Sequence, residues 1–240
     1  MVLNKIKFFW VWLFIFMAMD IFSVKAQNVR QQSGWGAFFH SQKLSNKTGL
    51  HLDAQFRSAD DLAYVRNVLI RPGFTYFFDA KKNATLGYAF ILTNLGSTIN
   101  NDLIEHRIWQ QFIITTPIGK IPLVNRFRLE QRFIETSTTD IFSQRIRYFA
   151  RAVIPFQKQA TNKFSRGAFL ALQNEIFLHI QNKDLLNNKL FDQNRTYLAL
   201  GYRLNETMDL ETGYLNQHIK GTANTTTNHV LQLALYTRFK

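Results

Sequence analysis

NRFRLEQRF, residues 125–133, places its apolar side chains at every second position except for Asn125 and Gln131, and its charged side chains at the positions between them. In an extended chain one face receives the apolar side chains of Phe127, Leu129 and Phe133, and the other receives Arg126, Arg128, Glu130 and Arg132. A repeat of two residues is the signature of a β-strand, because successive side chains point to opposite faces. The charges gather on one face, so the two faces of this strand should meet very different surroundings.

The same alternation recurs in LHLDAQFR (50–57), in QRIRYFARAVI (144–154) and around Leu198 to Leu204, where apolar positions oppose Arg195 and Arg203. Weaker strands are predicted at 33–42, 66–78, 84–94, 104–115, 168–179, 208–218 and 229–239. Segments of about nine to eleven residues match the length of a tilted strand that crosses a bilayer. The pattern predicts an all-β fold, an antiparallel transmembrane β-barrel of about 10–12 strands. These segments number eleven, whereas bacterial barrels of one chain have an even number of strands. We therefore expect ten or twelve, with one strand missed or with 33–42 inside the barrel.

The predicted connectors differ in length. Short ones fall at 45–47, 79–83, 117–122 and 205–207, and longer polar ones at 95–103, 135–142, 180–193 and 219–228. Short and long connectors largely alternate, as periplasmic turns and extracellular loops do in outer-membrane barrels. The connector at 155–167 is an exception, because it is long where a short turn is expected.

The first residues predict export. Lys5 and Lys7 precede the apolar run Phe8–Met19, and the small residues of Val24-Lys25-Ala26 follow it. This order is typical of a secretory signal peptide. The run is too short for a membrane-spanning helix, which needs about 20 residues. We expect residues 1–26 to be a cleaved signal peptide and 27–240 to be one barrel domain located in the bacterial outer membrane.

The amino-acid composition limits the classes of partner and covalent modification that the protein can have. The chain has no cysteine, so it cannot form a disulfide framework or carry a lipid on a cysteine. Its formal net charge is +13, which becomes +11 without residues 1–26. Such a basic balance favours an anionic partner. Export argues against nucleic acid and favours outer-membrane lipid, the phosphates of lipopolysaccharide, or small anions. We expect a monomer.

The alternation alone does not decide which face of each strand contacts water. A soluble periplasmic β-barrel binding protein would show the same two-residue repeat, with its apolar side chains pointing inward. Rows of charge, long strands and the final segment LQLALYTRFK (231–240) favour the membrane interpretation. In that segment Phe239 lies near the C-terminus, and a terminal aromatic residue resembles the signal read by the outer-membrane assembly machinery.

Several local motifs share one order and spacing along the chain. They are Trp35, LIRPGFTY (69–76), LGY (86–88), EHRIWQQ (105–111), RFRLEQR (126–132), RIRY (145–148), NE (174–175), QNR (193–195) and GYL (213–215). Together they resemble a family of uncharacterised outer-membrane β-barrels common in Bacteroidetes, domain of unknown function 2490. The resemblance spans nearly the whole chain after residue 26 and implies a barrel in the outer membrane. It implies no activity.

The candidate site is a ladder of charges on the predicted interior face: Arg107, Arg126, Arg128, Glu130, Arg132, Arg145, Arg147, Arg151, Glu175 and Arg195. With Arg57, Arg71, Arg203, Asp53, Glu105 and Glu211 the face has eleven arginines and five carboxylates, a net charge of +6. Arginine stays charged and pairs with carboxylates through two hydrogen bonds. One interpretation is an Arg–Glu network that fills a narrow interior, and the other is a path or pocket that attracts anions.

The six arginines between Arg126 and Arg151 are opposed locally only by Glu130. We therefore expect a bound phosphate, sulfate or similar anion beside them.

No catalytic, metal or cofactor signature stands out. His51 and Asp53 share a strand face, but two ligands do not make a metal site. His40 and Ser41 are adjacent and point apart, whereas a serine nucleophile needs a histidine within hydrogen-bond reach. The expected function is therefore passive: a structural or interaction protein, or a narrow pore for small anionic solutes. The alternatives are a lipid-modifying outer-membrane enzyme and a soluble periplasmic binding protein.

Overall fold

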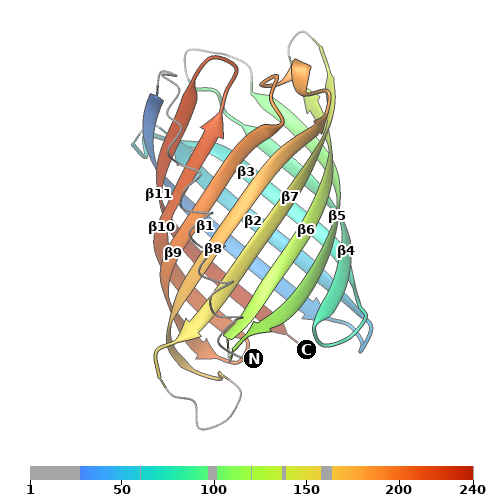
Figure 1. Cartoon of the computed structure of the whole chain (residues 1–240), viewed down its shortest axis with the longest axis vertical. Helices are drawn as coiled ribbons and strands as arrows, with labels where there is room; N and C mark the ends of the chain where they lie inside the picture. The colour runs from blue at the N-terminus through green and yellow to red at the C-terminus, as the bar shows by residue number, and fades with distance from the viewer. Residues whose placement is uncertain are drawn as a thin grey trace, which may run out of the picture.

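The computed structural model describes residues 28–59, 61–96, 102–119, 121–136, 139–157 and 164–239. The expected signal peptide lies outside these residues. The strands are β1 (Asn28–Lys43), β2 (Thr48–Ala59), β3 (Tyr64–Phe77), β4 (Lys82–Thr93), β5 (Leu103–Ile118), β6 (Ile121–Glu135), β7 (Ile141–Pro155), β8 (Gly167–Gln181), β9 (Phe191–Asn205), β10 (Met208–Lys220) and β11 (Thr225–Phe239). They form a closed barrel, so the predicted all-β barrel is confirmed (Figure 1).

The barrel closes between its first and last strands. β1 pairs with β11 in parallel, from Asn28 opposite Thr225 to Gln42 opposite Phe239. The other neighbouring pairs are antiparallel. The described residues form eleven strands, which lies within the predicted range of about 10–12, but the even number that we favoured, ten or twelve, is wrong. The barrel is antiparallel as predicted except where β1 meets β11. Eleven up-and-down strands bring the first and last into the same direction, and 33–42 lies in the wall as part of β1.

The two ends of the barrel differ. At the end drawn lower in Figure 1, where β11 finishes, the strands are joined by 44–47, 78–81, 119–120, 156–166 and 206–207. At the upper end, where β1 begins, they are joined by 60–63, 94–102, 136–140, 182–190 and 221–224. Four of the five lower connectors are short, and 156–166 is the long exception. The upper connector 182–190 contains a short 3-10 helix, Lys183–Leu185. No helix in the described part of the chain is long and apolar enough to cross a membrane.

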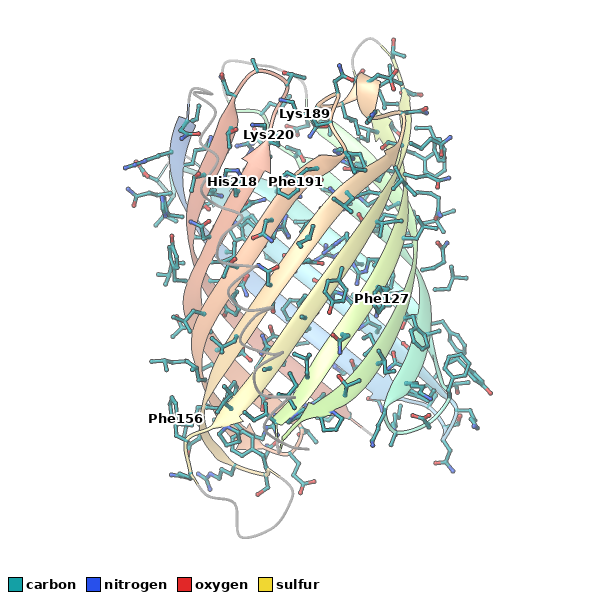
Figure 2. The ribbon with its side chains drawn as sticks, viewed as in Figure 1. Phe127, Phe156, Lys189, Phe191, His218 and Lys220 are labelled. Atoms are coloured by element: carbon teal, nitrogen blue, oxygen red, sulfur yellow. The ribbon has the colours of Figure 1, made fainter. Side chains whose placement is uncertain are left out.

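The barrel wall separates an apolar outside from a polar inside. Large hydrophobic side chains are exposed along many strands, among them Phe56, Phe127, Leu200 and Leu231, the last with 68% of its surface exposed. Figure 2 shows Phe127 between the two ends of the barrel, with Phe156 at the lower end. Polar and charged side chains outnumber apolar ones at the buried positions, and arginine is the most frequent of them. This distribution is the reverse of that in a soluble domain, where apolar side chains fill the interior.

Part of the interior is filled by aromatic rings that lie over glycine. Trp109 on β5 is fully buried, and its register partner on β4 is Gly87. A Cβ atom at Gly87 would lie 2.2 Å from the Trp109 ring and 2.6 Å from the Pro72 carbonyl oxygen. The missing side chain therefore makes room for the ring, which packs with Leu69, Ala89 and Ile91.

Candidate functional site: the charged interior

The ten side chains of the predicted ladder lie on five consecutive strands. Arg107 is on β5, Arg126, Arg128, Glu130 and Arg132 on β6, Arg145, Arg147 and Arg151 on β7, Glu175 on β8 and Arg195 on β9. Arg126, Arg132 and Arg151 are partly buried and the others are buried. Arg126 on β6 reaches Glu175 on β8 at 2.6 Å, passing β7 between them. These side chains therefore meet inside the barrel, and we call their contacts the interior network.

Glu130 is the centre of the interior network, with 1% of its surface exposed. Its Oε2 accepts hydrogen bonds from Nε and Nη2 of Arg145 at 3.0 and 2.6 Å, and its Oε1 accepts one from Arg147 at 2.5 Å. Arg107 and Arg128 lie 3.6 and 3.9 Å from the same carboxylate. One buried anion thus balances several cations, and charge-assisted hydrogen bonds of this kind are the stronger ones in proteins.

Two more carboxylates each join a pair of arginines. Glu105 lies 2.6 Å from both Arg107 and Arg132, which are themselves register partners on β5 and β6. Glu175 lies 2.6 Å from both Arg126 and Arg147. Each bridge offsets the repulsion between two neighbouring positive charges.

These contacts correct the expected anion site. The patch from Arg126 to Arg151 is opposed not by Glu130 alone but also by Glu105, Glu175, Asp192 and Glu211. Asp192 pairs with Arg145 at 2.7 Å, and Glu211 pairs with Arg151. The patch is therefore already occupied by carboxylates of the protein.

Asp192 and Asp209 were missing from the predicted ladder. The register of β8 and β9 shifts beside Asp192, which β-strand alternation would otherwise place on the opposite face from Gln193 and Arg195. A bulge adds one residue and so redirects a side chain. Asp209 pairs with Arg203 at 2.7 Å and with Arg238 at 2.8 Å. The sequence could have predicted Asp209 as an interior residue, because it lies two positions before Glu211 on the same strand and so faces the same side.

Arg57 and Arg195 are held differently. Arg57 donates from Nε and Nη2 to the Gln55 Oε1 at 3.1 and 2.6 Å, and its guanidinium lies 4.0 Å from the centre of the Trp35 ring. The guanidinium carbon of Arg195 lies 5.1 Å from the centre of the Trp35 ring and 4.7 Å from that of Phe177. In the described part of the chain neither has a carboxylate within 4.0 Å. The surplus positive charge of the interior is therefore centred on these two residues.

Three cavities follow one another along the interior. The upper one, of about 320 Å³, is lined by neutral polar side chains such as Ser33, Asn67 and Asn228. The middle one, of about 110 Å³, and the lower one, of about 230 Å³, share Arg57, Arg71, Arg147 and Arg195. Arg57 lines all three cavities.

The histidines do not gather into a site. His51 and Asp53 both line the lower cavity. Among the described residues no group of three or more possible metal ligands comes together. Glu105 points inward and is buried, whereas His106 is part-exposed and contacts Tyr88 and Glu135 at 2.5 and 3.2 Å.

Fold and interior define a class of protein: a closed β-barrel with an apolar exterior and a charged interior rich in arginine. The chain belongs to the family described as "Protein of unknown function (DUF2490)", which matches residues 32–228. Neither the curated proteins nor the solved structures contain a significant match to it.

Proposed function

We propose that this protein is an outer-membrane β-barrel of passive role, with an interior that forms a narrow path for small anionic solutes. The observation that carries the membrane part is the reversed distribution of side chains, with large apolar groups outside and charged groups inside. A closed barrel pairs its backbone groups between strands, so it can cross a lipid bilayer.

Aromatic side chains near both ends support a membrane position. The ring centres of Tyr76 and Phe78 lie 5.2 Å apart near the lower end. Those of Phe133 and Phe142 lie 5.1 Å apart near the upper end. Aromatic residues gather at the two interfaces of outer-membrane barrels. The mostly short lower connectors correspond to the periplasmic side in this arrangement.

The upper rim offers cations to lipid phosphates. Figure 2 shows Lys189 and Lys220 together at this end. Lys189 Nζ donates to the carbonyl oxygens of Gly221 and Thr222 at 3.3 and 3.1 Å, so the connector 182–190 is tied to the β10–β11 connector. Ammonium groups held at the outer interface suit contact with the phosphates of lipopolysaccharide.

The charge and the cavities favour an anion path. Positive groups in a low-dielectric enclosure concentrate counter-ions. The cavities share Arg57 at their junction, so a solute that moves from one to another passes its guanidinium.

A second candidate is a purely structural or interaction role with a sealed interior. The interior network favours it, because carboxylates of the protein already bind most of the arginines. Ion pairs that fill a narrow barrel would support the wall without conducting.

Planar-bilayer recordings in a potassium chloride gradient separate these functions. We expect a small conductance whose reversal potential indicates anion preference, and Arg57→Gln should weaken that preference. Arg30→Gln, at an exposed position on β1, is the control and should leave it unchanged. A barrel without conductance supports the structural role, cation preference contradicts the anion path, and a protein that stays soluble without detergent contradicts the membrane position.

A further inference from the structure

The guanidinium of Arg195 is buried, and no side chain or backbone group of the described residues forms a hydrogen bond with it. Only 9% of this residue is exposed, and its Nε has no hydrogen-bond partner among the described residues. Its register partner on β8 is Glu175, whose Oε1 instead accepts from Arg126 and Arg147, each at 2.6 Å. A buried charge that lacks a counter-charge is costly. No carboxylate of the described residues lies within 4.0 Å of Arg195, so an anion in direct contact with this guanidinium would be stabilising.

Aromatic rings hold this guanidinium, and no described residue accepts a hydrogen bond from it. Trp35 and Phe177 contact Arg195, and Trp35 also contacts Arg57. Cation–π contact stabilises the charge through the face of the guanidinium plane. The N–H donors lie in that plane, so the ring contacts do not occupy them.

Arg71 adds a third donor beside the same cavities. Its Nη2 pairs with Asp53 at 2.6 Å, but its Nε has no hydrogen-bond partner in the part of the chain that the structure describes. Arg57, Arg71 and Arg195 all line both the middle and the lower cavity. The lower cavity, of about 230 Å³, has ample room for a small ion.

We propose that Arg57, Arg71 and Arg195 form a binding site for a small tetrahedral oxyanion, phosphate or sulfate, at the junction of the middle and lower cavities. Guanidinium groups bind such oxygens through paired hydrogen bonds, which a halide cannot accept in the same way. This inference rests on the proposed function and deepens it by naming the anion class, but it can be tested without conduction.

Arg128 is a matched control. It lies 4.4 Å from the Trp109 ring, and its Nε and Nη2 donate to Gln111 Oε1 at 3.2 and 2.7 Å, as Arg57 does with Trp35 and Gln55. It is 2% exposed, and it lines neither the middle nor the lower cavity. Arg128 therefore shares the ring and amide contacts of Arg57, differs from it in having Glu130 at 3.9 Å, and does not line the cavities of the proposed ligand.

The test is calorimetric titration of the full chain, folded in detergent micelles, with sodium sulfate and with sodium phosphate at constant ionic strength in chloride. We expect saturable binding to the wild type. Arg195→Gln should weaken it about tenfold or more, the effect of losing charge-assisted hydrogen bonds. Arg128→Gln should bind like the wild type. If Arg195→Gln does not fold, Arg57→Lys keeps the charge, loses the paired geometry and should also bind more weakly.

A folded wild type without saturable binding would overturn the site, and so would equal losses in Arg195→Gln and Arg128→Gln. Binding without conductance would leave the site standing and contradict the path. Anion-selective conductance without sulfate or phosphate binding would do the opposite.

Discussion

The guanidinium carbons of Arg147 and Arg195 both lie over the ring of Phe177, at 4.4 and 4.7 Å from its centre. Arg147 also has two carboxylates, Glu130 at 2.5 Å and Glu175 at 2.6 Å. Arg195 has no such partner among the described residues. These two buried guanidinium groups share an aromatic neighbour and differ in their counter-charge, so they allow the value of the ion pairs to be measured.

Arg147→Gln should lower the free energy of unfolding by about 3 kcal/mol, because it removes a partner from two buried carboxylates. Arg195→Gln should change it by less than about 1 kcal/mol, since no carboxylate loses a partner and only aromatic contacts are lost. Urea unfolding in lipid vesicles without added sulfate or phosphate measures both. Equal losses would mean that the ion pairs of Arg147 contribute no more than the aromatic contacts.

Among the strand pairs, the parallel pair of β1 and β11 is the unusual one. Parallel pairing is slightly less stable per residue than antiparallel pairing. Side chains add contacts across it: Phe39 stacks on Tyr236 at 4.6 Å, His40 Nδ1 lies 2.8 Å from Thr237 Oγ1, and Ser33 donates to Asn228 at 3.1 Å. These contacts are spread along the pair, so they favour one register.

The chain has no cysteine, so a disulfide can report this pairing. Ala37 and Ala234 are register partners, and we expect Ala37→Cys with Ala234→Cys to form a disulfide in the folded barrel. Faster migration of the unfolded, non-reduced protein on a gel would detect the loop. Ala37→Cys with Ala199→Cys, which places the second cysteine on β9, is the control and should stay reduced. Efficient linkage in the control alone would mean that β1 pairs elsewhere.

For the molecule as a whole, the described chain begins at the upper end and finishes at the lower end (Figure 1). The two rims also differ, because four of the five lower connectors are short and the upper rim has the longer connectors 94–102 and 182–190. If the barrel spans the outer membrane as proposed, this asymmetry sets its orientation.

Labelling of single cysteines in intact cells tests that orientation. A membrane-impermeant maleimide should label Ala223→Cys, in the exposed β10–β11 connector, but not Asn46→Cys, in the exposed β1–β2 turn. After the outer membrane is permeabilised, both should react. Labelling of Asn46→Cys alone in intact cells would reverse the orientation, and equal labelling of both would contradict a sealed membrane position.

The amino-acid sequence was sufficient to predict the closed all-β barrel, its family and the face on which each of the ten ladder residues lies. The physical reason is that the alternation of side chains is a local property of an extended chain. Arg128 and Glu130 must share a face whatever their strand pairs with, and Phe127 and Leu129 must lie on the other.

Closure and cross-barrel contacts required the three-dimensional structure. Because eleven up-and-down strands alternate in direction, β1 and β11 run parallel where the barrel closes, and no local pattern encodes that these two strands pair. The bulge beside Asp192 interrupts the strict alternation of faces on which the prediction depended, so that Asp192 is buried beside Gln193. Glu175 pairs with Arg126 and Arg147 rather than with its register partner Arg195, because side chains from different strands compete for the same few carboxylates inside a closed wall. Charge counting predicted a positive interior, but only this competition decides that the unpaired charge lies at Arg57 and Arg195.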